Sequence, residues 1–307
     1  MRLRAAQPAP PLPTGAEKVA AVDAMFDAIA PGYDVTNRVI SLGLDVGWRR
    51  RTVRSLGLPA GSAVLDLACG TGDLCAELSR QGLVPIGADR SAGMLTAARH
   101  RFAAPAADRS AGLLTAARHR FAAPAADRSA GMPTAARHRF AAPAAASRPG
   151  RSALARRPGP AGPPPPFVRG DGLALPFRSG ALDGLVCGFA LRNFAALPPV
   201  LAECARVLRP GGRLALLEVD APAQPLLRFG HRLWFGRIVP LVGGLVAARS
   251  GAPRARAAAA YRYLPASVAY LPPPSELVAL IAAAGFADPQ RRPLSGGIAQ
   301  LLTGTRR

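Results

Sequence analysis

Short apolar runs alternate with amphipathic stretches along much of the chain, a pattern that predicts strands alternating with helices. Residues 197–208 have apolar side chains at helical spacing, and the Arg-Pro-Gly-Gly sequence at 209–212 is typical of a helix end. The expected strands cover residues 64–67, 83–88, 167–171, 182–189 and 213–218. We therefore predict an α/β fold with a doubly wound, mostly parallel sheet, which binds ligands beyond the carboxyl ends of its strands.

A unit of 19 residues that begins at Ala88 occurs three times in succession. Each copy has few large apolar side chains among its arginines and alanines, so we do not expect the copies to stack into a repeat fold. Only the first copy follows a strand-like run, which places Asp89, but not Asp108 or Asp127, at a strand end. Residues 141–166 form a Pro/Ala/Arg linker, expected to be extended or disordered.

The net charge of +21 does not by itself indicate nucleic-acid binding. Residues 89–166 contain 13 arginines and 3 aspartates, so about half of the excess comes from the repeats and the linker. Lys18 is the only lysine, and arginine in place of lysine, with much alanine and proline, is typical of a GC-rich genome. No basic stripe with interleaved aromatic residues and no zinc-finger spacing is present, so no nucleic-acid partner is expected.

The four cysteines form no CxxC pair, which favours reduced thiols over disulfides and predicts no metal site. The first residues lack the apolar core of a signal peptide. The apolar run at 238–248 is too short to span a bilayer. We expect a cytoplasmic protein.

Residues 64–74 resemble a buried strand that enters a glycine-rich turn and opens a helix. Gly70 and Gly72 let the backbone adopt conformations that a Cβ atom disfavours and approach a ligand closely. Asp89 ends the next apolar run, where folds of this kind bind ribose hydroxyls. The turn therefore predicts a nucleotide-type cofactor, and a tight turn without a ligand is the alternative.

The residues after the turn favour S-adenosylmethionine over a dinucleotide. Cys75 stands where a dinucleotide fingerprint has its third glycine, and Asp73 lies in the first helical turn, where it would repel phosphate. S-adenosylmethionine has no phosphate, carries a cationic sulfonium and ammonium, and has a ribose diol for Asp89. Asp66 is expected to orient the loop and the ammonium group, or else to cap backbone donors at the strand end.

Several motifs resemble the ubiquinone/menaquinone biosynthesis C-methyltransferases. The similarity covers roughly residues 17–304, apart from the repeats and the linker. The N-terminal motifs are Met25-Phe26-Asp27, Ala30, Tyr33-Asp34, Asn37 and Trp48-Arg49-Arg50. The central motifs are Asp66 with Gly70 and Gly72, Gly170-Asp171, Leu191-Arg192-Asn193 and Arg206 to Gly212. The C-terminal motifs are Tyr261-Arg262-Tyr263-Leu264, Ser267, Ala284-Gly285-Phe286 and Ser295 to Ala299.

The resemblance implies a class I S-adenosylmethionine-dependent methyltransferase, Rossmann-like, with a seven-stranded sheet, an N-terminal helical lid and a helical substrate cap. Residues 1–16 would be a disordered tail, and 17–106 the lid and the first half of the domain. Residues 107–166 would be an insertion. Residues 167–307 would form the second half, with the cap at about 221–270.

The resemblance also implies the cofactor positions, and the two glycines among them offer close backbone approach. These positions are Thr71, Asp89, Asp171, Gly172 and Gly188. Together with Asp66, Gly70 and Gly72 they form the predicted cofactor site.

The implied reaction is methylation of a ring carbon of a polyprenylated hydroquinone, from demethylmenaquinol to menaquinol. Proton loss from the quinol hydroxyl would activate the carbon, so a base or a cation beside the phenolate would help. Arg192, Asn193 and Tyr33 are the predicted catalytic residues, with Asp34 and His231 as further candidates. Arg192 paired with a carboxylate and Tyr33 packed in the core are the structural alternatives.

A polyprenyl tail needs an apolar entrance, and residues 226–246 combine large apolar side chains with arginines. They could form an amphipathic cap that touches anionic lipid, or a core helix instead. Two other functions stay open: methylation of another aromatic small molecule, and a non-catalytic basic adaptor whose repeats bind polyanions. The sequence does not fix the oligomeric state.

Overall fold

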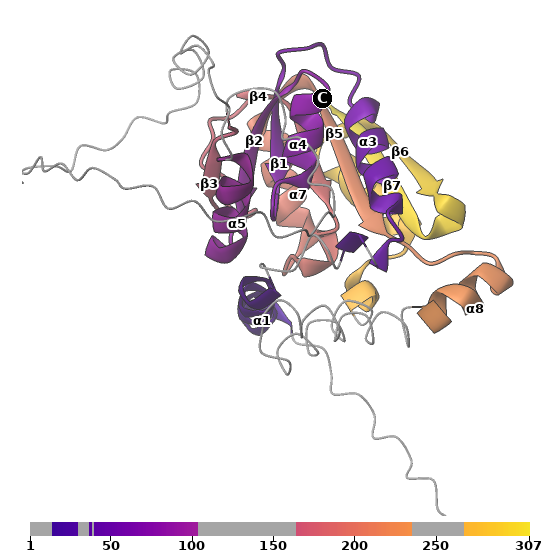
Figure 1. Cartoon of the computed structure of the whole chain (residues 1–307). Helices are drawn as coiled ribbons and strands as arrows, with labels where there is room; N and C mark the ends of the chain where they lie inside the picture. Colours follow the sequence, from indigo (N-terminus) through magenta and orange to yellow (C-terminus); the bar gives the residue numbers. More distant parts are fainter. Residues whose placement is uncertain (1–13, 30–36, 39, 104–163, 235–266) are drawn as a thin grey trace, which may run out of the picture.

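A computed structural model describes residues 14–29, 37–38, 40–103, 164–234 and 267–307, and its centre is one seven-stranded sheet (Figure 1). The strand order is β3-β2-β1-β4-β5-β7-β6. The strands are β1 (Ala63–Leu67), β2 (Val84–Asp89), β3 (Phe167–Arg169), β4 (Leu182–Gly188), β5 (Leu208–Val219), β6 (Phe286–Leu294) and β7 (Ala299–Arg306). The first five strands pair in parallel, while β7 pairs antiparallel with both β5 and β6. The predicted doubly wound, mostly parallel sheet is confirmed.

The strand order reverses between β1 and β4. From β1 the chain continues outward through β2 to β3, then returns to place β4 on the other side of β1. Crevices for ligands form at such a reversal, outside the carboxyl ends of the strands. This end of the sheet carries the glycine-rich turn after β1 and Asp89 at the end of β2.

Helices cover both faces of the sheet. Successive side chains of β1 point to opposite faces, and the apolar ones on each face pack against helices. Leu65 and Leu67 pack into a core with α7 and α11, whereas Val64 packs on the other face with α3 and α4. The α-helices are α1 (Gly15–Ile29), α3 (Leu44–Ser55), α4 (Asp73–Arg80), α5 (Ala92–Phe102), α7 (Leu197–Val207), α8 (Pro225–Leu233) and α11 (Pro274–Ala283). Three short 3-10 helices are η2 (Leu191–Asn193), η4 (Ser267–Tyr270) and η5 (Ser295–Gly297).

Several local predictions are confirmed. Helix α7 ends at Val207, one residue before the predicted end, and β5 begins at Leu208 rather than at residue 213 because Leu208 already pairs with Leu182. The Ser91 side chain caps α5 by accepting a hydrogen bond from the Met94 N–H at 3.0 Å. All four cysteines are free and buried.

The end of α5 and the start of β3, which flank the long connection between them, lie next to each other. Phe102 ends α5 and Phe167 begins β3, and their rings pack with centroids 5.4 Å apart. Just before β3, the Pro166 carbonyl accepts a hydrogen bond from the Gly87 N–H at 3.0 Å. The second and third repeat copies and most of the linker lie outside the described residues.

Helix α1 lies apart from both faces of the sheet, below the strand ends in Figure 1. It contacts α5 and η2 and begins at Gly15, inside the stretch expected to be a disordered tail. Only part of the predicted cap at 221–270 is described, as α8 and η4. Within the described ranges, none of the helices has the length and apolar character needed to cross a bilayer.

Candidate active site

Two adjoining cavities lie at the carboxyl ends of the central strands. The main cavity opens to solvent between helix α1 and the ends of β1, β2 and β4. The small cavity lies beside the glycine-rich turn. Four residues line both cavities: Ala68, Gly70, Gly188 and Phe189. The two cavities therefore form one continuous site.

The glycine-rich turn owes its shape to two residues in the left-handed region. Gly70 has φ 54° and Gly72 has φ 83°. A Cβ atom on Gly70 would meet nothing within 4 Å, so this backbone faces open space, whereas one on Gly72 would lie 2.8 Å from the Phe102 ring. Gly70 thus meets the predicted need for close approach, and Gly72 also makes room for α5.

Asp89, at the end of β2, accepts a hydrogen bond from the turn that follows β1. Its Oδ2 accepts a hydrogen bond from the Gly70 N–H at 2.8 Å, and its Oδ1 accepts one from the Ser91 N–H at 2.9 Å. Burial raises the pKa of the Asp89 carboxyl, although these backbone donors oppose the shift. Asp89 lines the main cavity, at the position predicted for a ribose-binding acid.

The neighbouring Arg90 joins two acids across the mouth of the main cavity. Its guanidinium pairs with Asp171 at 2.6 Å and with Asp23 of α1 at 3.0 Å. All three residues line the cavity. The predicted adenine-side acid is therefore connected to helix α1 through Arg90, although the two acids are far apart in the chain.

The two predicted close-approach glycines both line the main cavity, yet side chains occupy the space beside them. A Cβ atom on Gly172 would lie 3.0 Å from the Phe194 ring, and one on Gly188 would lie 2.9 Å from Leu74. Packing within the protein therefore accounts for the absence of a side chain at both positions.

Asp66 is the most unusual acid of the site. The carboxylate is 1% exposed, and its Oδ2 accepts hydrogen bonds from the Cys75 N–H at 3.1 Å and the Cys75 thiol at 3.3 Å. Its Oδ1 is buried, has no hydrogen-bond partner in the described structure, and belongs to a residue that lines the small cavity. Burial raises the pKa of Asp66 to about 7, against the opposing hydrogen bonds from Cys75. The geometry suits a cationic donor in the small cavity.

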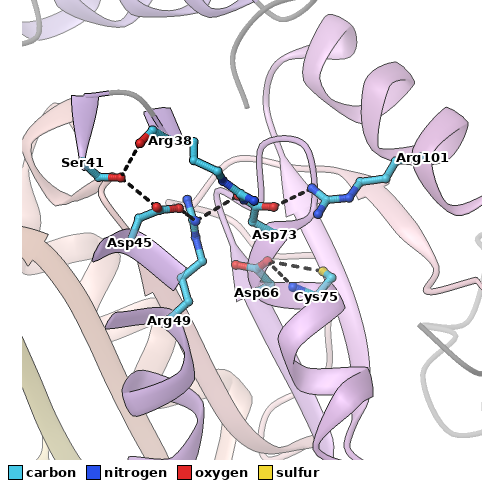
Figure 2. A network of polar contacts seen from close by, with 8 residues as sticks. All are labelled: Arg38, Ser41, Asp45, Arg49, Asp66, Asp73, Cys75 and Arg101. Carbon is cyan, nitrogen blue, oxygen red and sulfur yellow. Dashed lines mark hydrogen bonds and ion pairs between the residues drawn. The ribbon is translucent and has the colours of Figure 1, made fainter. Parts of the chain in front are cut away.

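The expectation that Asp73 would repel phosphate needs correction, because arginines neutralise this acid. Figure 2 shows Arg49, Arg38 and Arg101 gathered around it. The Asp73 carboxylate pairs with Arg101 at 2.6 Å and with Arg49 at 3.0 Å. Burial alone would raise the pKa of Asp73, but the arginines outweigh it and hold the pKa below its usual value. The acid that disfavours an anion here is Asp66, whose Oδ1 has no donor.

The structure buries Arg192 in an ion pair with Glu218, and its predicted catalytic role stays a prediction. Its buried guanidinium pairs with the fully buried Glu218 and donates to the Ser267 hydroxyl at 3.0 Å and to the Phe189 carbonyl at 2.9 Å. Arg192 is absent from the lining of both cavities. The carboxylate pairing that the structural alternative expected is present, and the contacts of Arg192 fix η2 and Phe189.

Asn193, next in the chain, does line the main cavity. Its Oδ1 is buried and makes no hydrogen bond in the described structure. Buried polar atoms without a partner are rare in proteins and indicate a missing ligand or water. Asn193 is therefore placed to bind a polar group of a ligand.

The remaining predicted site residues differ in how far the structure describes them. Thr71 is buried and lines the small cavity rather than the main one. Tyr33 and Asp34 lie outside the described residues, and so does the side chain of His231. Their predicted roles stay predictions.

Lys18 fixes helix α1 over the main cavity. The ammonium group donates to the Phe194 carbonyl at 2.7 Å and lies 3.7 Å from the centroid of the Tyr270 ring. The residue is 4% exposed, and burial lowers the pKa of its ammonium. The apolar residues Val19, Val22 and Phe26 of α1 then line the cavity. A lysine on a short helix normally extends into water, so the sequence carried no signal for this contact.

Two non-glycine residues with positive φ lie where the cavities join. Ala68 has φ 55° and Phe189 has φ 61°, and each residue follows the end of a central strand. Such conformations cost roughly 1–3 kcal/mol each and concentrate at functional sites. The Phe189 ring also lies 5.9 Å from the Arg49 guanidinium and 6.1 Å from the Trp48 ring, which orders this wall.

Comparisons with known proteins point to one family. The model of the ubiE/COQ5 methyltransferase family matches residues 14–139 and 165–306. The demethylmenaquinone methyltransferase of Thermus thermophilus is 35% identical over 284 residues, which cover 92% of this chain and all of the relative. The demethylmenaquinone methyltransferase of Roseiflexus castenholzii is 34% identical over 299 residues, 96% of this chain and 98% of the relative.

Proposed function

The chain belongs to the ubiE/COQ5 methyltransferase family, and we propose that it transfers the methyl group of S-adenosylmethionine to a ring carbon of a polyprenylated hydroquinone. The acceptor we propose is demethylmenaquinol, which becomes menaquinol. The names of the relatives from Roseiflexus castenholzii and Thermus thermophilus support this choice.

One observation in the structure carries the cofactor assignment. Asp66 and Asp89 end adjacent strands and face two connected cavities, and Asp66 keeps a buried oxygen without a donor. A ligand that carries both a ribose and an ammonium would offer a partner to each of these acids. Asp89 would hold the ribose, Asp171 the adenine side, and Asp66 the ammonium.

The protein's own groups then have separate tasks. When bound, S-adenosylmethionine supplies an electrophilic methyl group on a cationic sulfur. Gly70 lines the junction of the cavities and would leave the backbone close to the ligand. The lid residues Val19, Val22 and Phe26 would exclude water from the main cavity, which aligns the reactants and protects them.

The acceptor would meet the apolar wall formed by α1, Phe189 and Phe194. Asn193 Oδ1 would accept a hydrogen bond from a ring hydroxyl and so orient the ring carbon beside it. Arg192 would act through this contact, since it fixes η2 by its bonds to Phe189 and Glu218. Tyr33 keeps the catalytic role that the family resemblance implies for it.

The proposal is tested by methyl transfer from labelled S-adenosylmethionine. The acceptors are demethylmenaquinol, a demethoxyubiquinol-type quinol and a panel of other aromatic compounds. We expect transfer to demethylmenaquinol. A protein that binds S-adenosylhomocysteine but labels no quinol would overturn the acceptor assignment, and labelling of another aromatic compound alone would replace it.

We also propose that the protein works at the cytoplasmic face of the membrane and touches lipid through α8. Leu226 is 81% exposed and Phe229 is 63% exposed on this helix. Double substitution of both by Asp should reduce flotation with anionic vesicles, while Leu44→Asp on exposed α3 surface should not. Equal flotation of all three proteins would contradict the role of α8.

A further inference from the structure

Helix α1 carries two acids, Asp23 and Asp27, which lie one helical turn apart and so on the same face. Both acids contact the short segment between β2 and α5. Asp23 pairs with the Arg90 guanidinium at 3.0 Å. Asp27 accepts hydrogen bonds from the Ser91 hydroxyl and from the Gly93 N–H, the latter at 3.1 Å. The two acids therefore attach α1 to this segment.

The same segment leads to the acids of the predicted cofactor site. The Ser91 N–H donates to Asp89 at 2.9 Å, while the Ser91 hydroxyl donates to Asp27. Arg90 joins α1 to Asp171 in the same way, with a distance of 2.6 Å to the Asp171 carboxylate. Each acid of α1 is therefore connected to an acid of the predicted cofactor site through one intervening residue.

Apolar side chains of the same helix form one wall of the main cavity. Val19, Val22 and Phe26 line this cavity, and so does Asp23. Asp27 is absent from the lining of both described cavities, so its contacts with α5 are its link to the site. A ligand in the main cavity would lie against the apolar wall. Ligand binding and the position of α1 must then influence each other.

We propose that Asp23 and Asp27 are positioning residues that hold α1 closed over the main cavity, and that the cofactor enters and leaves only while α1 is open. This role rests on the proposed function, because it takes the ligand of the main cavity to be S-adenosylmethionine. The Asp23 side chain is 36% exposed, and Asp27 is exposed as well. Contacts as exposed as these stabilise the closed position only modestly, so α1 can open.

Lys18 makes the opening of α1 measurable. It is the only lysine of the chain, it is 4% exposed, and it donates to the Phe194 carbonyl at 2.7 Å. A lysine-specific protease can therefore cut the chain only after Lys18, and it can do so only when this part of α1 has left its place. Asp27 lies toward the other end of the helix. An effect of Asp27 on this cleavage therefore requires the helix to move as a unit.

The test follows this cleavage together with the association and dissociation rates of S-adenosylhomocysteine, measured by surface plasmon resonance. Asp27→Ala should speed cleavage of the protein without ligand roughly 2- to 5-fold, and addition of Asp23→Ala should bring this to roughly 5- to 20-fold. A saturating concentration of S-adenosylhomocysteine should slow cleavage of the wild-type protein at least about tenfold. Glu276→Ala, at an exposed acid on α11, is the matched control and should change none of these rates.

The rates of ligand binding separate a gate from an ordinary binding contact. Because the cofactor passes only through the open form, the double variant should speed association and dissociation by similar factors. Its equilibrium affinity should change by less than about threefold. Faster dissociation with unchanged association would overturn the proposal, because the two acids would then stabilise only the bound state. Unchanged cleavage in the double variant would also overturn it.

A test without any variant uses salt. Raising the salt concentration from about 50 to 500 mM screens partly exposed ion pairs, so it should speed both the cleavage at Lys18 and the release of S-adenosylhomocysteine. The cleavage rate is corrected for the activity of the protease on a free lysine peptide. Absence of any salt effect on both rates would overturn the proposal. A protein that binds no S-adenosylhomocysteine would instead contradict the proposed cofactor, and cleavage without ligand would still test the two acids.

Discussion

Trp48 donates a hydrogen bond from its indole Nε1 to the Ser295 hydroxyl, 2.9 Å away across 247 residues of sequence. The N-terminal and C-terminal motifs that resemble the family thus meet directly. Trp48 also packs on Phe189, at the junction of the two cavities. The N-terminal and C-terminal motifs therefore hold one wall of the site together.

Removing this hydrogen bond should cost stability without removing cofactor binding. We expect Ser295→Ala and Trp48→Phe to lower the free energy of unfolding, the first by about 1 kcal/mol. The double variant should lose less than the sum, because the shared bond is lost once. Urea titrations of the four proteins measure this coupling, and strictly additive losses would show that the bond contributes nothing.

Asp66 predicts a pH dependence of ligand binding. Its pKa of about 7 in the ligand-free protein means that a cationic ligand must first displace a proton. The affinity for S-adenosylhomocysteine should therefore rise with pH, by roughly tenfold between pH 6 and 8, and level off above the pKa. Calorimetry across this range tests the slope, and Asp66→Asn should bind weakly at every pH. A flat wild-type profile would contradict the ammonium contact.

Arg192 and Glu218 form a buried ion pair. Removing the charge of one partner should therefore destabilise the protein more than removing both charges. Arg192→Met leaves the fully buried Glu218 without its cation and should cost about 3–5 kcal/mol in the free energy of unfolding. Adding Glu218→Gln should recover part of that loss. Chemical denaturation checks both values, and a double variant less stable than the single one would argue against the pairing.

Substitution of Asn193 should weaken the reaction with the acceptor but leave cofactor binding unchanged. Loss of a hydrogen bond in the reacting complex costs about 1–3 kcal/mol, so Asn193→Ala should lower kcat/KM for the quinol roughly 5- to 150-fold. Affinity for S-adenosylhomocysteine should stay within about twofold, as measured by calorimetry. Equal effects on both ligands would mean that Asn193 acts on the shape of the whole cavity.

The connection between α5 and β3 should be dispensable for cofactor binding. Phe102 and Phe167 pack against each other at its two ends, so a short Gly/Ser linker can replace residues 107–162 while Pro166 is kept. We expect S-adenosylhomocysteine affinity within about threefold of the full chain. Loss of binding in a folded variant would show that the replaced residues belong to the site.

The parallel core and its loop were predictable because their signals are local. Apolar runs of strand length, glycines after β1 and an acid after β2 each lie within a few residues, and Ser91 caps the helix that follows them. Strand β6 gave no such signal, since Asp288, Pro289 and Pro293 interrupt its apolar pattern. Proline is tolerated there because β6 is an edge strand, a property of the finished sheet that single-strand patterns do not encode.

The ion pairs of Arg192 and Asp73 depend on contacts between distant segments of the chain. Arg192 follows a strand end, where a ligand contact is the usual expectation, but Glu218 on the neighbouring strand pairs with it. Asp73 was expected to repel phosphate, but Arg49 and Arg101, from two other helices, pair with it. The topology of the fold decides which charged residues pair with each other. The sequence neighbours of one residue do not reveal such pairs.

The packing of Phe102 on Phe167 also bears on how such a chain can change over generations. Side-chain contact holds α5 and β3 in place, so the length of the connection enters only through the entropy of closing it. That entropy grows with the logarithm of length, and a sixfold longer connection costs only roughly 1.6 kcal/mol. Tandem duplication at this point therefore changes the stability of the fold only slightly.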